Sequence, residues 1–261
     1  MEEGLSIYPD VIDLRAFYGE RLGQVARRLL SAKLRAHWPS VAGDRLVGIG
    51  FATPYLAPFA AEAERTLAFM PAPQGVVNWP GDARNRACLV VDDALPLPDA
   101  SVDRIIAVHS IEMAENARFL LRELWRVLAP GGRLLAVVPN RRGIWARVER
   151  TPFGYGRPFS GSQMAALMRD TQFTIAASSQ ALFAPPFGRN WLYRSGTGWE
   201  RVGSVLWPAF AGVVIVEAVK QLYQGLPARP RGRLSPSFRP VLVPPAAAGH
   251  AGRIARDRPP S

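Results

Sequence analysis

The chain has 261 residues, which suits one sizeable α/β domain with additional segments and leaves little room for two ordinary domains. Hydrophobic residues make up 48% and charged residues 20%, a balance that is typical of a globular protein and excludes a largely disordered one. The formal net charge of +11 suggests a nucleic-acid partner, but the charge is unevenly distributed. After Leu226, seven arginines and one aspartate give a net charge of +6 in a proline-rich stretch. We therefore expect residues 225–261 to form a mobile basic tail, and we expect no nucleic-acid role.

The cysteine content and the N-terminus point to a cytoplasmic protein. Cys88 is the only cysteine, so no disulfide forms within the chain and a reducing compartment is expected. The first residues, MEEGLSIYPD, are acidic and lack the features of a secretory signal. The most membrane-like run, residues 209–219, is too short to span a bilayer and contains Glu217. We predict no membrane partner and no metal site.

The hydrophobic pattern predicts helices at the N-terminus and then alternating strands and helices. Residues 11–38 have an amphipathic pattern that predicts one or two helices, which precede the core and could cover its cleft. The predicted strands lie at 45–50, 65–70, 87–93, 104–110, 133–138, 173–179 and 211–219. The predicted helices between them lie at 55–65, 117–128 and 161–170, and we expect Gly131 and Gly132 to stop the second of these. This alternation predicts a mostly parallel sheet covered on both faces.

One stretch of about fifty residues carries a family resemblance. Residues 92–140 read DDALPLPDASVDRIIAVHSIEMAENARFLLRELWRVLAPGGRLLAVVPN. The acidic strand end, the "LP.PD.S.D" loop and the helix ending "RVL.PGGRLL" resemble the second half of a class I S-adenosylmethionine-dependent methyltransferase of the type 11 family. The resemblance extends roughly over residues 40–223. It implies an α/β, Rossmann-like class I methyltransferase sandwich, whose seven-stranded, mostly parallel sheet has an antiparallel last strand, and S-adenosylmethionine as cofactor.

The resemblance divides the chain into three parts. These are an N-terminal helical cover at 1–40, a methyltransferase-like domain at 41–224 and the basic tail at 225–261.

The first cofactor loop, LVGIGFATPYL at 46–56, departs from the family pattern. Similar methyltransferases end the first strand with an acidic residue and continue into a GxGxG-like turn, whose glycines let the backbone approach the cofactor. Here Gly48 stands at the acidic position. Pro54 replaces the last glycine, which fixes φ and removes a backbone N–H. The candidate cofactor-binding residues in this loop are Gly48, Gly50, Ala52 and Thr53.

The nucleoside positions are also altered. The family usually ends its second strand with a carboxylate for the ribose hydroxyls, and this chain has Met70 there. Losing a charged acceptor costs about 1.5 to 3 kcal/mol if nothing replaces it. At the adenine end, the family pattern implies that Asp92 or Asp93 accepts from the amino group and that Leu95 covers the ring. The alternative is that one of these aspartates only caps the following turn.

His109 is the candidate catalytic residue, because it follows the fourth predicted strand, where ligands bind in sheets of this type. A neutral imidazole there could act as a base toward an acidic O–H or N–H. The alternative is a structural histidine with satisfied hydrogen bonds. Methyl transfer mainly requires in-line alignment, so a dedicated base is not a necessity.

Residues 138–160 combine arginines with aromatic residues after the fifth strand. We interpret this segment as a lid whose arginines hold an anionic acceptor and whose glycines at 143, 154 and 156 permit movement. The alternative is a surface loop with solvated arginines. The candidate substrate-binding residues are His109, Asn140, Arg141, Tyr155 and Arg157. Further along, the aromatic segment from Trp191 to Trp207 is a candidate for part of the pocket or for a protein interface.

Three functions are consistent with these features. The first is S-adenosylmethionine-dependent methyl transfer to a small, anionic acceptor. The second is a catalytically inactive, methyltransferase-like binding or regulatory subunit, which the residues at 48, 54 and 70 favour. The third, a nicotinamide-dependent oxidoreductase, is disfavoured because the third glycine and the ribose carboxylate of a dinucleotide site are missing.

Overall fold

The computed structural model describes residues 9–186 and 210–222. The chain divides into two units, Met1–Tyr223 and Gln224–Ser261, and all described residues belong to the first. The predicted basic tail and the segment from Trp191 to Trp207 lie outside the described residues. None of the described helices is both long and apolar enough to cross a lipid bilayer. The described ranges also contain no group of three or more histidine, cysteine, aspartate or glutamate residues placed to hold a metal ion.

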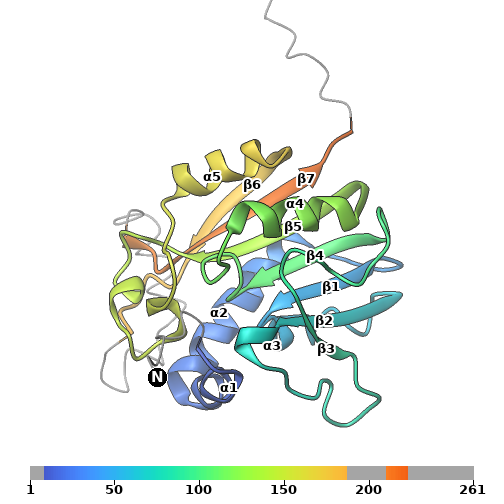
Figure 1. Cartoon of the computed structure of the whole chain (residues 1–261). Helices are drawn as coiled ribbons and strands as arrows, with labels where there is room; N and C mark the ends of the chain where they lie inside the picture. The colour runs from blue at the N-terminus through green and yellow to red at the C-terminus, as the bar shows by residue number, and fades with distance from the viewer. Residues whose placement is uncertain (1–8, 187–209, 223–261) are drawn as a thin grey trace, which may run out of the picture. The chain divides into compact units, whose positions relative to one another are not determined.

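A seven-stranded sheet forms the middle layer, with the strand order β3-β2-β1-β4-β5-β7-β6 (Figure 1). The first five strands in this order run parallel, and β7 is antiparallel to both of its neighbours. The strands are β1 Arg45–Gly50, β2 Arg65–Pro71, β3 Ala87–Val90, β4 Val102–Val108, β5 Leu128–Pro139, β6 Phe173–Ala181 and β7 Val213–Lys220. The predicted fold class, including the antiparallel last strand, is confirmed.

Helices cover both faces of the sheet, with α1 and α2 on one side and α4 and α5 on the other (Figure 1). The α-helices are α1 Val11–Gly19, α2 Arg21–His37, α3 Thr53–Leu56, α4 Ala117–Val127 and α5 Gly161–Asp170. Three short 3-10 turns are η1 Ala72–Gln74, η2 Trp145–Arg147 and η3 Pro152–Gly154. The N-terminal pattern at 11–38 thus forms two helices, as the sequence allowed.

The alternation of strand side chains creates two separate cores. In β1, Leu46 packs into the cluster beneath α1 and α2, whereas Val47 packs into the cluster beneath α4 and α5. In β4, Ile106 and Ile105 divide between the same two clusters. Both faces of the central strands are therefore buried, which explains their continuous apolar sequences.

Two predicted helices have different bounds in the structure. The helix expected at 55–65 is only the four-residue α3, followed by irregular turns. Pro58 has no N–H to continue the helical hydrogen bonds, so the helix stops at Leu56. The helix at 117–128 ends at Val127, before the glycines that were expected to stop it, because β5 begins directly at Leu128.

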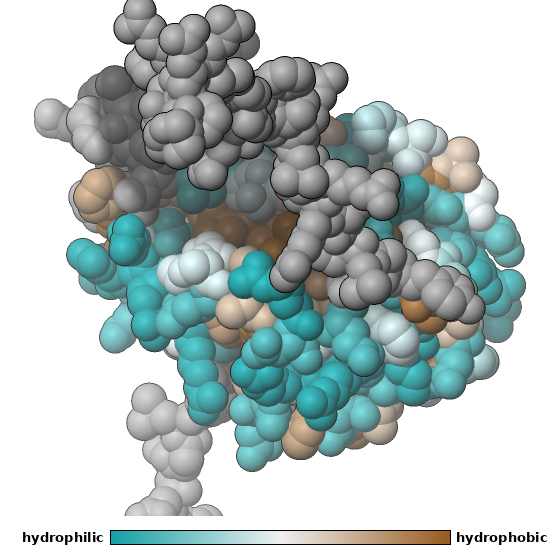
Figure 2. Space-filling view, turned by 90° about the horizontal axis from the view of Figure 1, so that it is seen from above, coloured by the Kyte–Doolittle hydropathy of each residue, from teal (hydrophilic) through white to brown (hydrophobic). Residues whose placement is uncertain are grey.

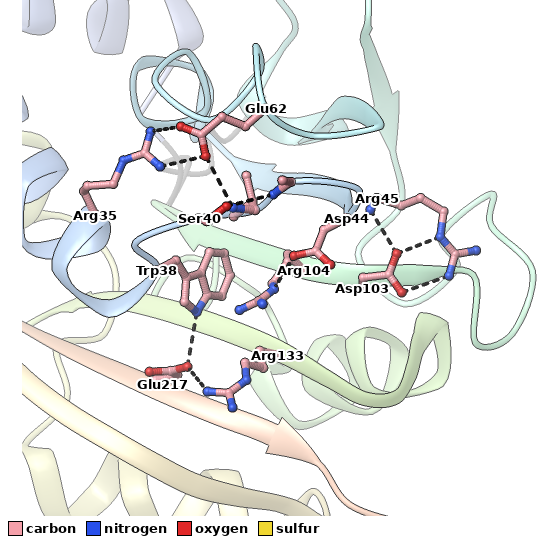
Figure 3. A network of polar contacts seen from close by, with 12 residues as sticks. Arg35, Trp38, Ser40, Asp44, Arg45, Glu62, Asp103, Arg104, Arg133 and Glu217 are labelled. Carbon is pink, nitrogen blue, oxygen red and sulfur yellow. Dashed lines mark hydrogen bonds and ion pairs between the residues drawn. The ribbon is translucent and has the colours of Figure 1, made fainter.

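Ion pairs join the strands at their amino ends (Figure 3). Nε of Arg45, the first residue of β1, lies 2.8 Å from Oδ2 of Asp103 near the start of β4. Nε of Arg104 lies 2.8 Å from Oδ2 of Asp44. The hydrogen bond from Arg45 lowers the pKa of the Asp103 carboxyl. Both ion pairs hold the amino ends of β1 and β4 together. Sheets of this type bind ligands at the carboxyl ends of the strands, so the ion pairs lie at the opposite edge from the expected site.

A buried carboxylate connects α2 to β7. Glu217 accepts hydrogen bonds from Nη1 of Arg133 at 2.6 Å and from Nε1 of Trp38 at 3.2 Å (Figure 3). Burial acts to raise the pKa of Glu217, but the hydrogen bonds from Arg133, His37 and Trp38 outweigh it and the pKa is lowered. The charge in this otherwise apolar strand is therefore structural.

Candidate functional site

His109 lies at the carboxyl end of β4 and is completely buried. Its φ of 51° is in the left-handed region, which is uncommon for a residue other than glycine. Its Nε2 lies 2.8 Å from the hydroxyl of Tyr18 in the last turn of α1. An N-terminal helix thus reaches the strand end where ligands are expected.

Two further side chains, those of Tyr55 and Glu112, extend this contact into a buried polar chain. The hydroxyl of Tyr55 in α3 donates to the Tyr18 oxygen at 2.8 Å. Because the Tyr18 oxygen accepts from Tyr55, its own proton is directed to Nε2 of His109. The other ring nitrogen of His109, Nδ1, faces Oε1 of Glu112 at 3.5 Å. The order is Tyr55, Tyr18, His109, Glu112.

Burial keeps the two phenols protonated. Burial raises the pKa of Tyr18 well above its usual value, and Tyr55 and Glu112 raise it further. Burial also raises the pKa of Tyr55. Tyr18 therefore acts as a neutral hydrogen-bond donor in this chain, and its hydroxyl is a poor candidate for a base.

Aromatic rings enclose the Tyr18 side chain. Its ring stacks on Phe51 with a centroid distance of 5.7 Å and an interplanar angle of 18°. It meets Phe17 and Tyr55 edge-on at 5.1 Å and 5.8 Å. The ring of Phe153, from η3, lies 4.8 Å from the imidazole of His109. The result is a buried aromatic enclosure with one polar wall.

That wall contains buried polar atoms that have no hydrogen-bond partner among the described residues. They are Oε1 of Gln74, Nδ1 of His109, Oγ of Ser110 and both carboxyl oxygens of Glu112. The Gln74 side chain also contacts His109, because its Nε2 donates to the backbone oxygen of His109 at 3.1 Å. Native structures contain few such atoms, and their concentration in one place is typical of a functional site.

The predicted cofactor loop is closely packed in this structure. A side chain at Gly48 would overlap Leu56 and Ala52, so the strand has no room for the family's carboxylate. Gly50 has a φ of 76°, and a Cβ there would overlap the carbonyl oxygens of Val108 and His109. The remaining predicted cofactor residues, Ala52, Thr53 and Met70, are buried.

A cavity of about 690 Å³ lies at the carboxyl ends of β2 and β3, and we call it the β3 cavity. It is lined by Ala72, Pro73, Val90, Val91, Asp92, Asp93, Glu115, Asn116, Phe119 and Leu120. Both candidate adenine-binding aspartates therefore face it. Leu95 packs instead in the core beneath α4, and its N–H donates to Oε1 of Glu123 at 2.7 Å.

A second cavity, of about 510 Å³, adjoins the first at Glu115 and Asn116, and we call it the arginine cavity. Arg118, Arg141 and Arg157 line it together with Gln163. The structure thus brings together two of the predicted substrate residues. Asn140 is buried, does not line this cavity and donates to the backbone oxygen of Ala211 at 2.8 Å, whereas Tyr155 is exposed.

The glycines at 143, 154 and 156 have a packing role. A Cβ at each would overlap a backbone carbonyl oxygen, that of Ala211, Val148 and Glu112 respectively. Close approach of the backbone thus explains these glycines, and the expectation that they provide freedom of movement has no support in their surroundings.

Tyr18 and Gln74 were not predicted from the sequence, and Glu112 was noted only for its position after the fourth strand. Tyr18 belongs to the apolar stripe of an N-terminal helix, and nothing in its local pattern indicates a polar partner in the fourth strand. Glu112 left a signal, because it is a carboxylate in the mostly apolar run SIEMA directly after the candidate base. A carboxylate in such a run is rarely buried unless it has a role.

Figure 2 shows the molecule from above the view of Figure 1, and hydrophilic residues cover most of the described part of this face. Hydrophobic residues are visible mainly toward the middle of the view.

Comparison with known proteins shows a similarity to methyltransferases. Residues 47–136 match the family model for a methyltransferase domain. The ubiquinone/menaquinone biosynthesis C-methyltransferase UbiE of Rubrivivax gelatinosus is 33% identical over 110 residues, which are 41% of this chain and 43% of the relative. The 27-O-demethylrifamycin SV methyltransferase of Amycolatopsis mediterranei is 28% identical over 172 residues, which are 57% of this chain and 62% of the relative. The chain thus spans about half the length of the curated relatives it matches.

Solved structures show the same fold. An S-adenosylmethionine-dependent methyltransferase of Thermotoga maritima has a TM-score of 0.56 at 18% identity, covering 81% of this chain and 96% of that one. The chain bound to the Trm112 methyltransferase activator of Haloferax volcanii has a TM-score of 0.59 at 21% identity, covering 81% and 98%. The family model, the relatives and the solved structures agree, so residues 47–136 resemble the methyltransferase-domain family and the sheet has the fold of these methyltransferases.

Proposed function

We propose that the chain transfers a methyl group from S-adenosylmethionine to a small acceptor. The observation that carries this proposal is the pair of adjoining cavities at the carboxyl edge of the sheet. One is lined by Asp92 and Asp93, and the other by Arg141 and Arg157. Their chemistry suits a nucleoside on one side and an anionic acceptor on the other.

The β3 cavity fits the adenosine end of the methyl donor. Asp92 and Asp93 offer carboxylate oxygens to the adenine amino group, and Ala72, Pro73 and Phe119 offer apolar contact to the ring. When bound, the donor supplies an electrophilic methyl group on a sulfonium. Met70 is buried and offers no carboxylate to the ribose, so the ribose needs other partners.

The methionine end fits less well in the described conformation. The turn at Gly50 is packed against β4, and the aromatic residues of α1 fill the space beside it. Donor binding in full therefore requires a rearrangement near α1, which is the part of the proposed 1–40 cover that packs on this site.

The arginine cavity supports a small, anionic acceptor. Arginine holds carboxylates and phosphates through paired N–H donors, and Arg141 and Arg157 line the same cavity. We retain a cytoplasmic location and the division at 1–40, 41–224 and 225–261 as parts of this proposal.

Titration calorimetry with S-adenosylmethionine and S-adenosylhomocysteine tests the proposal. We expect micromolar binding to the wild type and a loss of tenfold or more, about 1.4 kcal/mol, in Asp92→Ala/Asp93→Ala. Glu64→Ala/Asp82→Ala is the matched control, because it removes two exposed carboxylates that lie outside both cavities. Absence of binding up to millimolar concentrations in the wild type would overturn the enzymatic function.

The closed site supports a second candidate, an inactive methyltransferase-like subunit that binds or regulates a protein. The Tyr18 hydroxyl is bonded to Nε2 of His109, and the chain lacks the carboxylates that the family pattern has at positions 48 and 70. This candidate predicts no donor binding and a stable protein complex, for which the segment from Trp191 to Trp207 is the proposed interface. The same titration, followed by size-exclusion chromatography with a purified partner, separates the two candidates.

A further inference from the structure

We propose that Glu115 binds the ribose hydroxyls of the methyl donor and thereby replaces the carboxylate that the family pattern has at position 70. Glu115 belongs to the segment between β4 and α4, whereas position 70 is in β2. The inference rests on the proposed methyl transfer, and it assigns a residue that determines nucleoside specificity in the same site.

The end of β2 offers no replacement for the missing carboxylate. Met70 is fully buried in the core, and the residues that follow it are Pro71, Ala72 and Pro73. None of these side chains has a hydrogen-bonding group that suits a hydroxyl, and the prolines also lack a backbone N–H. Ribose hydroxyls that bind here without partners lose their hydrogen bonds to water. A ribonucleoside in the β3 cavity therefore needs a polar side chain from another element.

Among the described residues, three carboxylates line the β3 cavity, and their positions differ. Asp92 and Asp93 line the β3 cavity alone, whereas Glu115 lines both the β3 cavity and the arginine cavity. In the donor molecule, the ribose joins the adenine to the sulfonium that carries the methyl group. A donor that has its adenine at Asp92 or Asp93 and its methyl group directed to the arginine cavity therefore has its ribose on the side of Glu115.

The charges around Glu115 favour contact with the donor over contact with the acceptor. The Glu115 carboxylate makes no hydrogen bond or ion pair with a described residue, and Nη2 of Arg118 is paired instead with Oδ2 of Asp170 at 2.8 Å. A carboxylate beside an anionic acceptor repels it. Ribose hydroxyls, by contrast, donate hydrogen bonds, and both oxygens of a carboxylate accept them. Glu115 thus suits a ribose better than the anion expected in the arginine cavity.

The backbone is fixed on both sides of Glu115. The N–H of Ala114 donates to the backbone oxygen of Ser110 at 2.8 Å, and the Ala114 side chain is buried. On the other side, the Asn116 side chain caps α4 by accepting from two backbone N–H groups of its first turn. Glu115 is exposed between these two anchored residues. A bound ribose therefore orders only one side chain here, which limits the entropy cost of binding.

Ribose recognition is measured with adenosine and 2′,3′-dideoxyadenosine, two neutral nucleosides that differ only in the two hydroxyls. Ligand-observed NMR titration is suitable because nucleosides lack most of the donor's contacts and bind weakly. We expect the wild type to bind adenosine about tenfold more tightly than dideoxyadenosine. Glu115→Ala is expected to bind the two within about twofold of each other, because the hydroxyls lose their charged acceptor.

Two control variants separate the ribose from the adenine and from general effects of charge. Asp92→Ala/Asp93→Ala is expected to weaken the binding of both nucleosides by a similar factor and to keep the preference for adenosine, since these carboxylates are assigned to the adenine. Asp82→Ala removes an exposed carboxylate outside both cavities and is expected to bind both nucleosides as the wild type does.

A preference for adenosine that persists in Glu115→Ala would overturn the inference and leave the proposed methyl transfer standing. Equal binding of the two nucleosides by the wild type, or no binding of either, would overturn it as well. The proposed function fails separately, when the wild type binds neither S-adenosylmethionine nor S-adenosylhomocysteine. A preference that depends on Glu115 in a protein that does not bind the donor would retain Glu115 as a ribose-binding residue and refute methyl transfer.

Discussion

The hydroxyl of Tyr18 lies 2.8 Å from Nε2 of His109, across a separation of 91 residues in the chain. This bond connects an N-terminal helix to the strand end at which the family binds its ligands. It also holds the buried imidazole against the ring of Tyr18, whose oxygen accepts a second hydrogen bond from Tyr55. Several properties of the chain depend on this bond and on the packing around it.

Removal of the Tyr18 hydroxyl is expected to destabilise the fold. Tyr18→Phe leaves Nε2 of His109 and the Tyr55 hydroxyl buried without their partner, at a cost of about 1 to 3 kcal/mol. Urea unfolding of the variant measures this loss. The control is Tyr155→Phe, whose hydroxyl is on an exposed side chain, with an expected change within about 0.5 kcal/mol. Equal effects in both variants would show that the buried bond contributes nothing specific.

Gly50, at the end of β1, is expected to tolerate substitution poorly because backbone atoms of Val108 and His109 lie where a Cβ would be placed. Gly43 and Gly50 have nearly the same φ, 77° and 76°, but only Gly50 has backbone atoms where a Cβ would lie. Gly43→Ala is expected to cost about 1 to 2 kcal/mol from backbone strain alone. Gly50→Ala adds a steric overlap of about 1 to 3 kcal/mol. Thermal or urea unfolding of the two variants measures the difference in their free energies of unfolding, which is the contribution of the steric overlap at Gly50. Equal losses of stability in both variants would show that this overlap contributes nothing.

Restoring the family's ribose carboxylate at position 70 is expected to fail. Met70 is fully buried in the core beneath α1 and α2, so Met70→Asp places a carboxylate in an apolar environment. The expected loss is about 3 to 5 kcal/mol of stability, without tighter donor binding. Met70→Leu keeps the volume and is expected to lose less than about 1.5 kcal/mol. A stable Met70→Asp protein with improved donor affinity would contradict this reading of the core.

The Arg45–Asp103 pair is expected to make stability depend on pH in the acid range. Arg45 lowers the pKa of Asp103 in the folded protein, so the pair stabilises the fold above the unfolded pKa of about 3.9. This contribution is lost as the pH falls through the lower, folded pKa. Because both side chains are partly exposed, it amounts to about 1 kcal/mol or less.

Urea unfolding from pH 7 to pH 2 compares the wild type with Asp103→Asn. The difference between them is expected to be constant near neutrality and to disappear at the acid end. Asp82→Asn, at an exposed position, is the control. A difference that grows toward low pH would have the wrong sign for this pair.

The sequence predicted the sheet well because its information is local and periodic. Buried strands such as β1 and β4 contain continuous apolar runs after their charged first residues, and the helix at 161–170 was predicted with its observed bounds. The two errors in helix length have local causes as well. Pro58 interrupts α3, and β5 begins before the glycines that were expected to end α4.

The site was less predictable because it depends on contacts between distant parts of the chain. His109 was singled out by its position after a strand, and Asp92 and Asp93 by the family pattern. Arg141 and Arg157 were singled out because they lie in an arginine-rich, aromatic segment after the fifth strand. The interaction with Tyr18 depends on how α1 packs against β4, and no local pattern encodes that. The roles of all these residues in binding and catalysis stay predictions until the titrations are made.

The position of β7 between β5 and β6 determines the order in which the sheet can form while the chain is being synthesised. The strands β1 to β5 can pair with one another as they emerge, and among them only β5 has a partner outside this set, β7, which lies later in the chain. Among the described strands β6 pairs only with β7, and β7 emerges last. The free edge of β5 and the unpaired β6 therefore wait for the final strand, and a stalled nascent chain exposes a sheet edge suited to aggregation or chaperone capture.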